Sequence, residues 1–99
     1  MLELAIGIIL GCCALGAGIC MGIGAIGPGV GEGHAVANAC EAIGRQPEAK
    51  GAVTSTMIMG CAISETTGIY ALVIAILLIF VAPGMLVNTL TNAIKTLGV

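Results

Sequence analysis

A single acidic residue stands in the otherwise apolar stretch Gly60-Cys61-Ala62-Ile63-Ser64-Glu65-Thr66-Thr67-Gly68-Ile69-Tyr70. The surrounding run 52–81 contains no other acidic or basic residue, and roughly 20 apolar residues suffice for one helix to cross a bilayer. A charge at the centre of a membrane costs about 2.5–3.5 kcal/mol on insertion scales, so an acid placed there is a candidate for function. Glu65 is therefore the first candidate site residue. Three hydroxyls follow it within two helical turns, those of Thr66, Thr67 and Tyr70.

The composition indicates a membrane protein. Of the 99 residues, 59% are hydrophobic and only 8% are charged, whereas a soluble domain carries about 25% charged residues. The net charge of −2 is small and suggests no nucleic-acid partner. The start Met1-Leu2-Glu3 has an acid where a secretory signal would be basic, so we expect the first apolar stretch to be retained as a span. The five cysteines form no CxxC pair, and we expect neither a disulfide nor a metal there.

These features predict an all-α membrane protein, a hairpin of two transmembrane helices. We expect the first helix over about residues 4–43 and the second over about 48–81, with a polar loop over 44–48. Arg45 and Lys50 flank this loop, and Lys95 is the only other basic residue. Because basic loops stay in the cytoplasm, we expect a cytoplasmic loop and both termini outside.

Local signals set the expected helix ends. Gly44 suits the position just past a helix, and Pro47 suits the first position of the next helix. Pro83-Gly84 is expected to end the second helix, so that residues 1–82 form the hairpin domain. The weakly amphipathic tail, 83–99, is expected either to lie on the outer membrane surface or to fray.

Glycines of the first helix fall into two stripes when placed at about 100° per residue. One stripe holds Gly18, Gly22, Gly29 and Gly33, and the other holds Gly16, Gly24, Gly27 and Gly31. Small residues let membrane helices approach closely, although glycine is also frequent in membrane helices generally. Two opposed contact faces suit a helix flanked on both sides, as in a closed homo-oligomeric ring. We therefore expect ring packing at Gly18, Gly22, Gly27, Gly29, Gly31 and Gly33.

A second acid, Glu32, is expected at the same depth as Glu65. Glu32 lies thirteen residues before Arg45, and Glu65 lies seventeen after Glu48, so both are roughly 20–25 Å from the turn. Two carboxylates in one apolar site will not both ionise, and they titrate as a unit. One state that fits is a monovalent cation between ionised Glu65 and protonated Glu32, in an all-oxygen shell. The Thr66 hydroxyl and the Ile63 carbonyl would complete that shell. In the alternative, the acids are protonated structural residues.

Three segments together resemble the c subunit (the proteolipid) of F-type ATP synthases, namely Gly27-Pro28-Gly29-Val30-Gly31-Glu32-Gly33, Arg45-Gln46-Pro47-Glu48-Ala49-Lys50-Gly51 and Glu65-Thr66-Thr67-Gly68-Ile69-Tyr70. The resemblance covers residues 4 to about 82. It implies many copies in a ring, in a bacterial inner membrane, with no catalysis by this chain itself. It also implies that a loop contact with the central-stalk subunits gamma and epsilon falls to Arg45, Gln46 and Pro47. Glu65 then carries an ion past the stator a subunit.

Within this family the pattern is most similar to the sodium-binding branch. That similarity implies a Na+ site with Glu32 where the branch usually has Gln, Thr66 at a Ser/Thr position and Ile63 as the carbonyl donor. It further implies that Thr67 holds a water and that Tyr70 orients the carboxylate. The Glu at position 32 departs from the commonest pattern of the branch.

Three other functions remain open at this point. The same rotor driven by H+ needs only the acid and one partner. A small membrane transporter with a membrane Glu normally needs four spans and an aromatic pocket, and this chain has one Phe and one Tyr. A structural membrane hairpin would not explain hydroxyls grouped around a buried acid.

Overall fold

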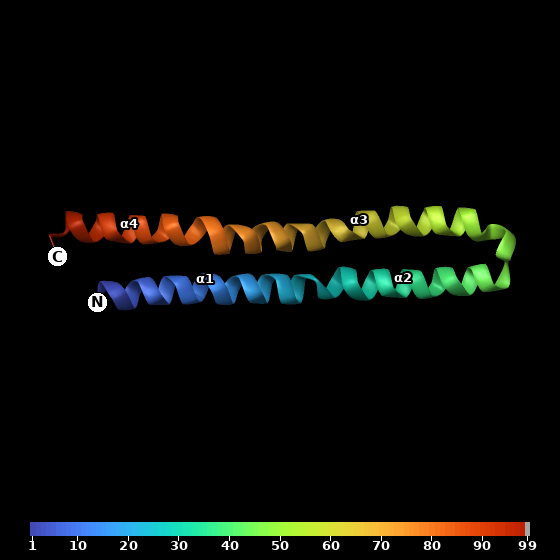
Figure 1. Ribbon diagram of the computed structural model, residues 1–99, viewed down its shortest axis with the longest axis horizontal. Coiled ribbons are helices and arrows are strands. Elements are labelled where there is room, and N and C mark those ends of the chain that lie inside the picture. The colour runs from blue at the N-terminus through green and yellow to red at the C-terminus, as the bar shows by residue number, and fades with distance from the viewer. Residues whose placement is uncertain (99) are drawn as a thin grey trace. The chain divides into compact units, whose positions relative to one another are not determined.

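The computed structural model describes residues 1–98, which are helical apart from residue 1 and short turns. The elements, shown in Figure 1, are α1 (Leu2–Gly24), α2 (Ile26–Arg45), the 3-10 turn η1 (Pro47–Ala49), α3 (Lys50–Ile76), the π-helical segment η2 (Leu77–Val81) and α4 (Ala82–Thr96). Two continuous helical stretches, Leu2–Arg45 and Pro47–Thr96, are long and apolar enough to cross a membrane. The predicted all-α hairpin of two long apolar helices is confirmed.

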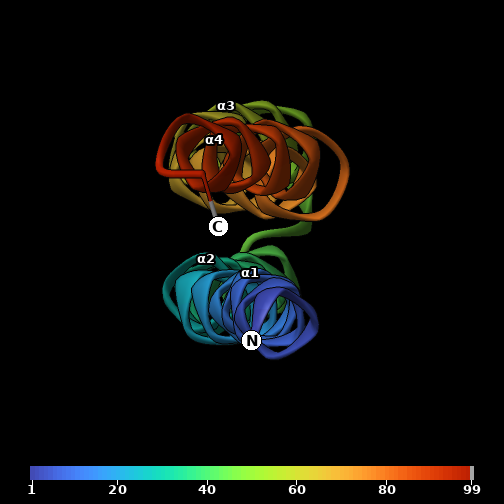
Figure 2. The ribbon, with the colours of Figure 1, turned by 90° about the vertical axis from the view of Figure 1, so that its left-hand side faces the viewer.

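The chain forms two compact units. One unit comprises Gly22–Ala71, and the other combines Met1–Met21 with the segment that starts at Leu72. Within each unit two helical segments lie side by side (Figures 1 and 2). The first unit contains the polar loop and both membrane acids, so it is the unit that holds the candidate site. The predicted division of the chain at residue 82 remains a prediction.

The first helix is interrupted at Ala25 because of a proline three residues further on. Pro28 has no N–H, so the carbonyl of Gly24 lacks its usual donor. Ala25 forms a turn between α1 and α2, and the Gly29 N–H donates to its carbonyl at 3.0 Å. The helix expected over residues 4–43 is therefore one helical stretch with a turn at Ala25, and it continues to Arg45.

The prediction that Gly44 stands past the end of the first helix is wrong. Gln46 takes that place, and its N–H donates to the Ala42 carbonyl at 2.9 Å. Local hydrogen bonding to the last turn thus closes the helix without a glycine in the left-handed region. Pro47 begins the next helical turn, as predicted. The Arg45 side chain forms an ion pair with Glu41, one turn earlier on α2, with 2.5 Å between the guanidinium nitrogen and the carboxylate oxygen.

The prediction that Pro83-Gly84 ends the second helix is also wrong. The π-helical segment η2 precedes the proline, and the Ala82 N–H donates five residues back to the Leu77 carbonyl. This wider turn shifts the hydrogen-bond ladder, so Pro83 falls in the first turn of α4, where a missing N–H costs little. The tail is helical as far as Thr96. Its place on a membrane surface remains a prediction.

The buried side chains of the hairpin are small. They are Cys13, Ala17, Pro28, Ala39, Ala71 and Ala75. Small residues between membrane helices allow close backbone packing. Many large apolar side chains are instead exposed, among them Phe80 at 76% and Ile63 at 69%. One chain therefore leaves most of its apolar surface for lipid or for other protein surfaces.

The two glycine stripes have different surroundings. An ideal Cβ at Gly24 would lie 2.6 Å from the Ala71 Cβ, and one at Gly16 would lie 3.6 Å from the Leu78 Cδ1. These two members of the second stripe thus face the chain's own second helix. The glycines predicted for ring packing are open, with nothing within 4 Å of an ideal Cβ except the Ser64 Oγ, 4.0 Å from the one at Gly31. They are Gly18, Gly22, Gly27, Gly29, Gly31 and Gly33. Their use by neighbouring copies remains a prediction.

Candidate ion-binding site

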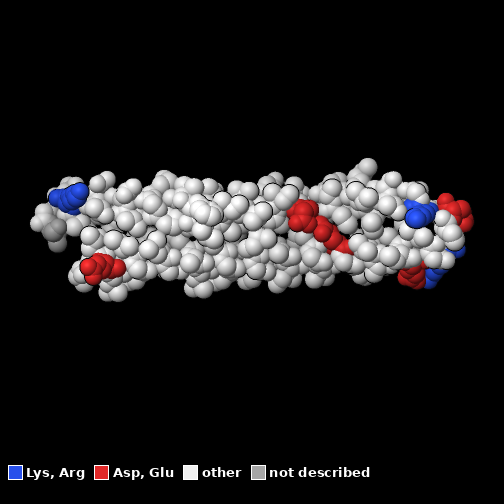
Figure 3. Space-filling view, viewed as in Figure 1, with Lys and Arg blue, Asp and Glu red and all other residues white. Residues whose placement is uncertain are grey.

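The structure brings together the two acids expected at one depth. The side chains of Glu32 on α2 and Glu65 on α3 lie close enough to interact directly. Figure 3 shows acidic atoms gathered over these two helices, set back from the charged groups at the loop. Because two carboxylates have only acceptors, a hydrogen bond between them requires one proton on the pair. A single proton on the pair would therefore allow the two carboxyl groups to hydrogen-bond to each other.

Glu32 is the more enclosed member of the pair. Its side chain is half-buried, while Glu65 is exposed on a single chain. The Glu32 Oε1 atom is buried, and it has no hydrogen-bond partner within the described residues. A buried polar atom left without a partner is costly. This oxygen is therefore positioned to accept from a ligand or a water.

The hydroxyls after Glu65 bond to the carbonyls of their own helix. Thr66 Oγ1 donates to the Ile63 carbonyl, and Thr67 Oγ1 donates to the Ser64 carbonyl at 3.0 Å. Each bond sets a hydroxyl oxygen beside a carbonyl oxygen. The Thr66 hydroxyl and the Ile63 carbonyl thus form a second pair of oxygens that could bind a cation. Within residues 1–98 no hydrogen bond joins this pair to the two carboxyl groups.

Two predicted site residues lie at the surface of the single chain. Tyr70 is 65% exposed and Ile63 is 69% exposed. The predicted contact of Tyr70 with the carboxylate is not made within the described part of the chain. One hairpin therefore brings together the two acids but leaves the other oxygen donors and the tyrosine on its surface.

A hollow of about 270 Å³ lies beside Glu32 in the same unit. Cys61 and Ser64 on α3 line it together with the acid. Ser64 stands directly before Glu65 in the sequence but is not among the predicted site residues, all of whose hydroxyls follow the acid. Its side chain is half-buried and adds a neutral hydroxyl to the surroundings of Glu32.

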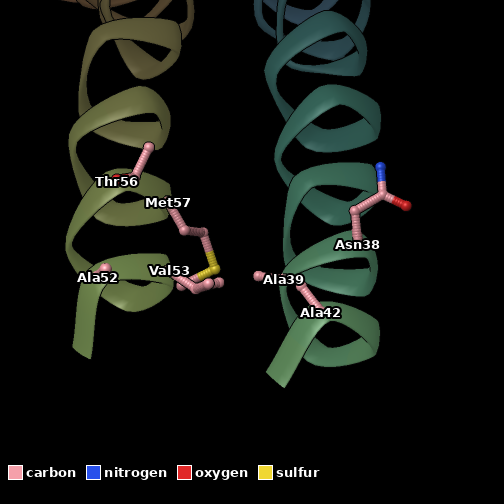
Figure 4. Close-up of a pocket in the computed structure, with 7 residues that line it drawn as sticks. All are labelled: Asn38, Ala39, Ala42, Ala52, Val53, Thr56 and Met57. Atoms are coloured by element: carbon pink, nitrogen blue, oxygen red, sulfur yellow. The ribbon is translucent and has the colours of Figure 1, made fainter. Parts of the chain in front are cut away.

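A second hollow, of about 410 Å³, lies nearer the loop and is not an ion site. Figure 4 shows Met57 and Val53 of α3 pointing toward Ala39 of α2 across it. Its polar members, Asn38 and Thr56, carry no charge. The acids are absent from its lining, so the carboxyl pair is separated from the loop by a largely apolar stretch.

The loop residues predicted to contact the central stalk are all exposed. They are Arg45, Gln46 and Pro47. The Arg45 side chain is 77% exposed even though it pairs with Glu41. The loop is thus available to a partner, while the partner itself remains a prediction.

The fold and the acid pair define a membrane proteolipid, that is, a hairpin of two membrane-length helices with carboxyl groups between them. Residues 15–78 match the family model of the ATP synthase C subunit. The chain therefore belongs to the family of ATP synthase c subunits. Members of this family form rings, and the chain is a membrane protein and a non-catalytic part of the synthase rotor.

Individual relatives agree with this assignment. The chain is 56% identical over 69 residues to the ATP synthase c subunit of Petrotoga mobilis, in an alignment that covers 70% of this chain and 72% of the relative. It is 53% identical over 79 residues to the c subunit of Thermotoga maritima, covering 80% of this chain and 93% of the relative. The c subunit of Alkaliphilus oremlandii is 53% identical over 76 residues, covering 77% of this chain and 85% of the relative.

Proposed function

We propose that this chain carries Na+ on Glu65 as one copy of a closed rotor ring, and so couples ion flow to ATP synthesis or hydrolysis. The observation that supports this most is that Glu32 and Glu65 lie next to each other while the buried Oε1 atom of Glu32 has no hydrogen-bond partner in the described residues. A carrier of protons alone needs one acid and one partner. An additional buried acceptor oxygen favours a ligand with several oxygen contacts.

The proton on the acid pair gives each acid a distinct role. Glu32 keeps the proton and donates a hydrogen bond to Glu65, which stays ionised. The unpartnered Oε1 of Glu32 then serves as a neutral oxygen ligand. A single positive cation balances the single negative charge of the pair, so the site takes a monovalent ion in preference to a divalent one.

The remaining oxygen donors come from the Thr66 hydroxyl and the Ile63 carbonyl, which are adjacent on α3. Both residues are exposed on the single chain, so the shell closes between two copies in the ring. One copy supplies Glu32 and Glu65, and the next copy supplies the hydroxyl–carbonyl pair. Thr67 holds a water near this boundary, and Tyr70 of a packed copy orients the carboxylate.

Rotation requires partners at two places. The exposed loop residues Arg45, Gln46 and Pro47 contact the central-stalk subunits gamma and epsilon on the cytoplasmic side, and both termini lie outside. At the depth of Glu65 the stator a subunit releases the ion and allows another to bind. Membrane lipid covers the remaining apolar surface. The second candidate function is the same rotor driven by H+, favoured by the closeness of the two acids, which can hold one proton between them.

The test uses the complete synthase reconstituted in liposomes. A sodium gradient without a proton gradient should drive ATP synthesis, and a proton ionophore should leave that synthesis unaffected. Synthesis that requires a proton gradient at every sodium concentration would contradict the sodium proposal and favour the proton rotor.

A further inference from the structure

The open position at Gly68 faces both the carboxyl group of Glu65 and the ring of Pro28. Gly68 and Pro28 are both buried. An ideal Cβ placed on Gly68 would lie 3.2 Å from Glu65 Oε1 and 3.4 Å from Pro28 Cγ. The first distance is tighter than nine in ten real Cβ contacts. A side chain at position 68 would therefore require the carboxyl group to shift by a few tenths of an ångström. We call this arrangement the Gly68–Pro28 seat.

The Gly68–Pro28 seat lies next to a point where the two helices pack closely. One turn away, an ideal Cβ on Gly24 would lie only 2.6 Å from the Cβ of Ala71. Gly24 lies four residues before Pro28, and Ala71 lies three after Gly68, so both pairs belong to one helix–helix contact. Backbones this close do not move apart without loss of packing. A side chain added at position 68 must therefore be accommodated by the flexible side chain of Glu65.

We propose that Gly68, with Pro28, is a positioning and specificity-determining residue of the ion site, because the seat keeps the Glu65 carboxyl group beside Glu32. This inference rests on the proposed ion-carrying role of Glu65. Gly68 supplies no ligand atom. Its contribution is the room that allows the two carboxyl groups to meet, and hence the geometry in which their oxygens surround a small cation.

The substitution Gly68→Ala tests the seat because it adds one methyl group and removes no donor. The added Cβ displaces the carboxyl group from the seat, and an off-rotamer side chain changes an equilibrium by roughly two- to tenfold. In assembled rings the displaced acid is more accessible, so a hydrophobic carbodiimide labels it roughly two- to tenfold faster without sodium. The sodium concentration that halves labelling rises by a similar factor.

The matched control is Gly51→Ala, on the same helix α3, where an ideal Cβ meets nothing within 4 Å. Its rings should label and respond to sodium as the wild type does. The double variant Gly68→Ala/Pro28→Ala removes the opposite side of the seat, so position 68 gains room and labelling returns toward the wild-type rate. Wild-type labelling and sodium response in Gly68→Ala rings would overturn the proposal.

If Gly68→Ala yields no ring, Pro28→Ala alone decides the question: it opens one side of the seat and should raise the labelling rate at least about twofold, and an unchanged rate overturns the proposal. If sodium fails to protect even wild-type rings, the sodium function fails. The labelling rates measured without sodium still establish or overturn the seat.

Discussion

The two compact units are built from the same kind of helix pair but hold different chemistry. The unit 1–21 with 72–98 is closed by small side chains such as Ala17 and Ala75, and its hollow of about 540 Å³ is lined by apolar residues. The unit Gly22–Ala71 has an acid pair, helical hydroxyls and the polar loop. The unit 1–21 with 72–98 is thus apolar, with acidic and basic side chains only near its ends. The unit Gly22–Ala71 contains acids within the membrane span, where a charge is costly.

Removing the acid in the second unit has the largest expected effect. Glu65→Gln keeps the size of the side chain but removes its charge, so rings should assemble while ion-coupled ATP synthesis falls to background. Synthesis in reconstituted vesicles and ring size on a gel measure both. The matched control is Glu3→Gln, the same change in the other unit, which should keep wild-type synthesis. Normal ion-coupled ATP synthesis in the Glu65→Gln complex would show that the acid in the unit Gly22–Ala71 is no more important than Glu3 in the other unit.

Changing the second acid should separate binding from titration. Glu32→Gln retains an oxygen ligand, so sodium binding to purified rings should persist within about tenfold. The two acids titrate as a unit, whereas the variant has one titrating group, and its labelling should follow the pH curve of a single acid. Calorimetry and a pH series of carbodiimide labelling provide the two readings. Complete loss of binding would show that a charge at position 32 is required.

Packing should respond more strongly in the unit that holds the site. Gly24→Ala places a Cβ 2.6 Å from Ala71 Cβ and should destabilise the hairpin by about 1–3 kcal/mol through overpacking. Gly16→Ala, in the other unit, makes an ordinary contact of 3.6 Å with Leu78 and should be tolerated. The midpoint temperature of ring dissociation compares the two. Equal midpoints would mean that the close approach at Gly24 is not the tighter contact.

The smallest effect is expected at the loop. Glu41→Gln removes the ion pair with Arg45, whose partners are 59% and 77% exposed respectively. Exposed pairs of this kind contribute about 0–1 kcal/mol, and salt screens them. The dissociation midpoint of the ring should therefore change little, and the change should vanish at high salt. A large shift would indicate that this pair is not simply a solvated surface contact.

The sequence was sufficient for the parts of the fold that depend on local pattern and length. Apolar run lengths predict the two helices, and the similar distances of Glu32 and Glu65 from the loop predict that the two acids meet. Pro47 marks a helix start because its fixed geometry acts locally. These features need no knowledge of which helix faces touch.

Other features depend on contacts that the local pattern does not contain. Pro83 would end a regular helix, but the π-helical turn before it shifts the hydrogen-bond ladder and lets the helix continue. Gly68 and Pro28 are forty residues apart in sequence, and their contact follows from the register of two packed helices. Sequence spacing also did not distinguish the glycines that face the chain's own second helix from those that remain open.

The central claim is that Glu65 holds sodium in competition with a proton. The most direct measurement is the rate at which a hydrophobic carbodiimide, which attacks the protonated acid, labels Glu65 in purified wild-type rings over a pH series, with and without sodium. If sodium and the proton compete for Glu65, sodium should slow labelling, and the pH at which the labelling rate is half its maximum should move with the sodium concentration. Labelling that ignores sodium across the whole pH range would contradict this competition and leave a proton as the carried ion.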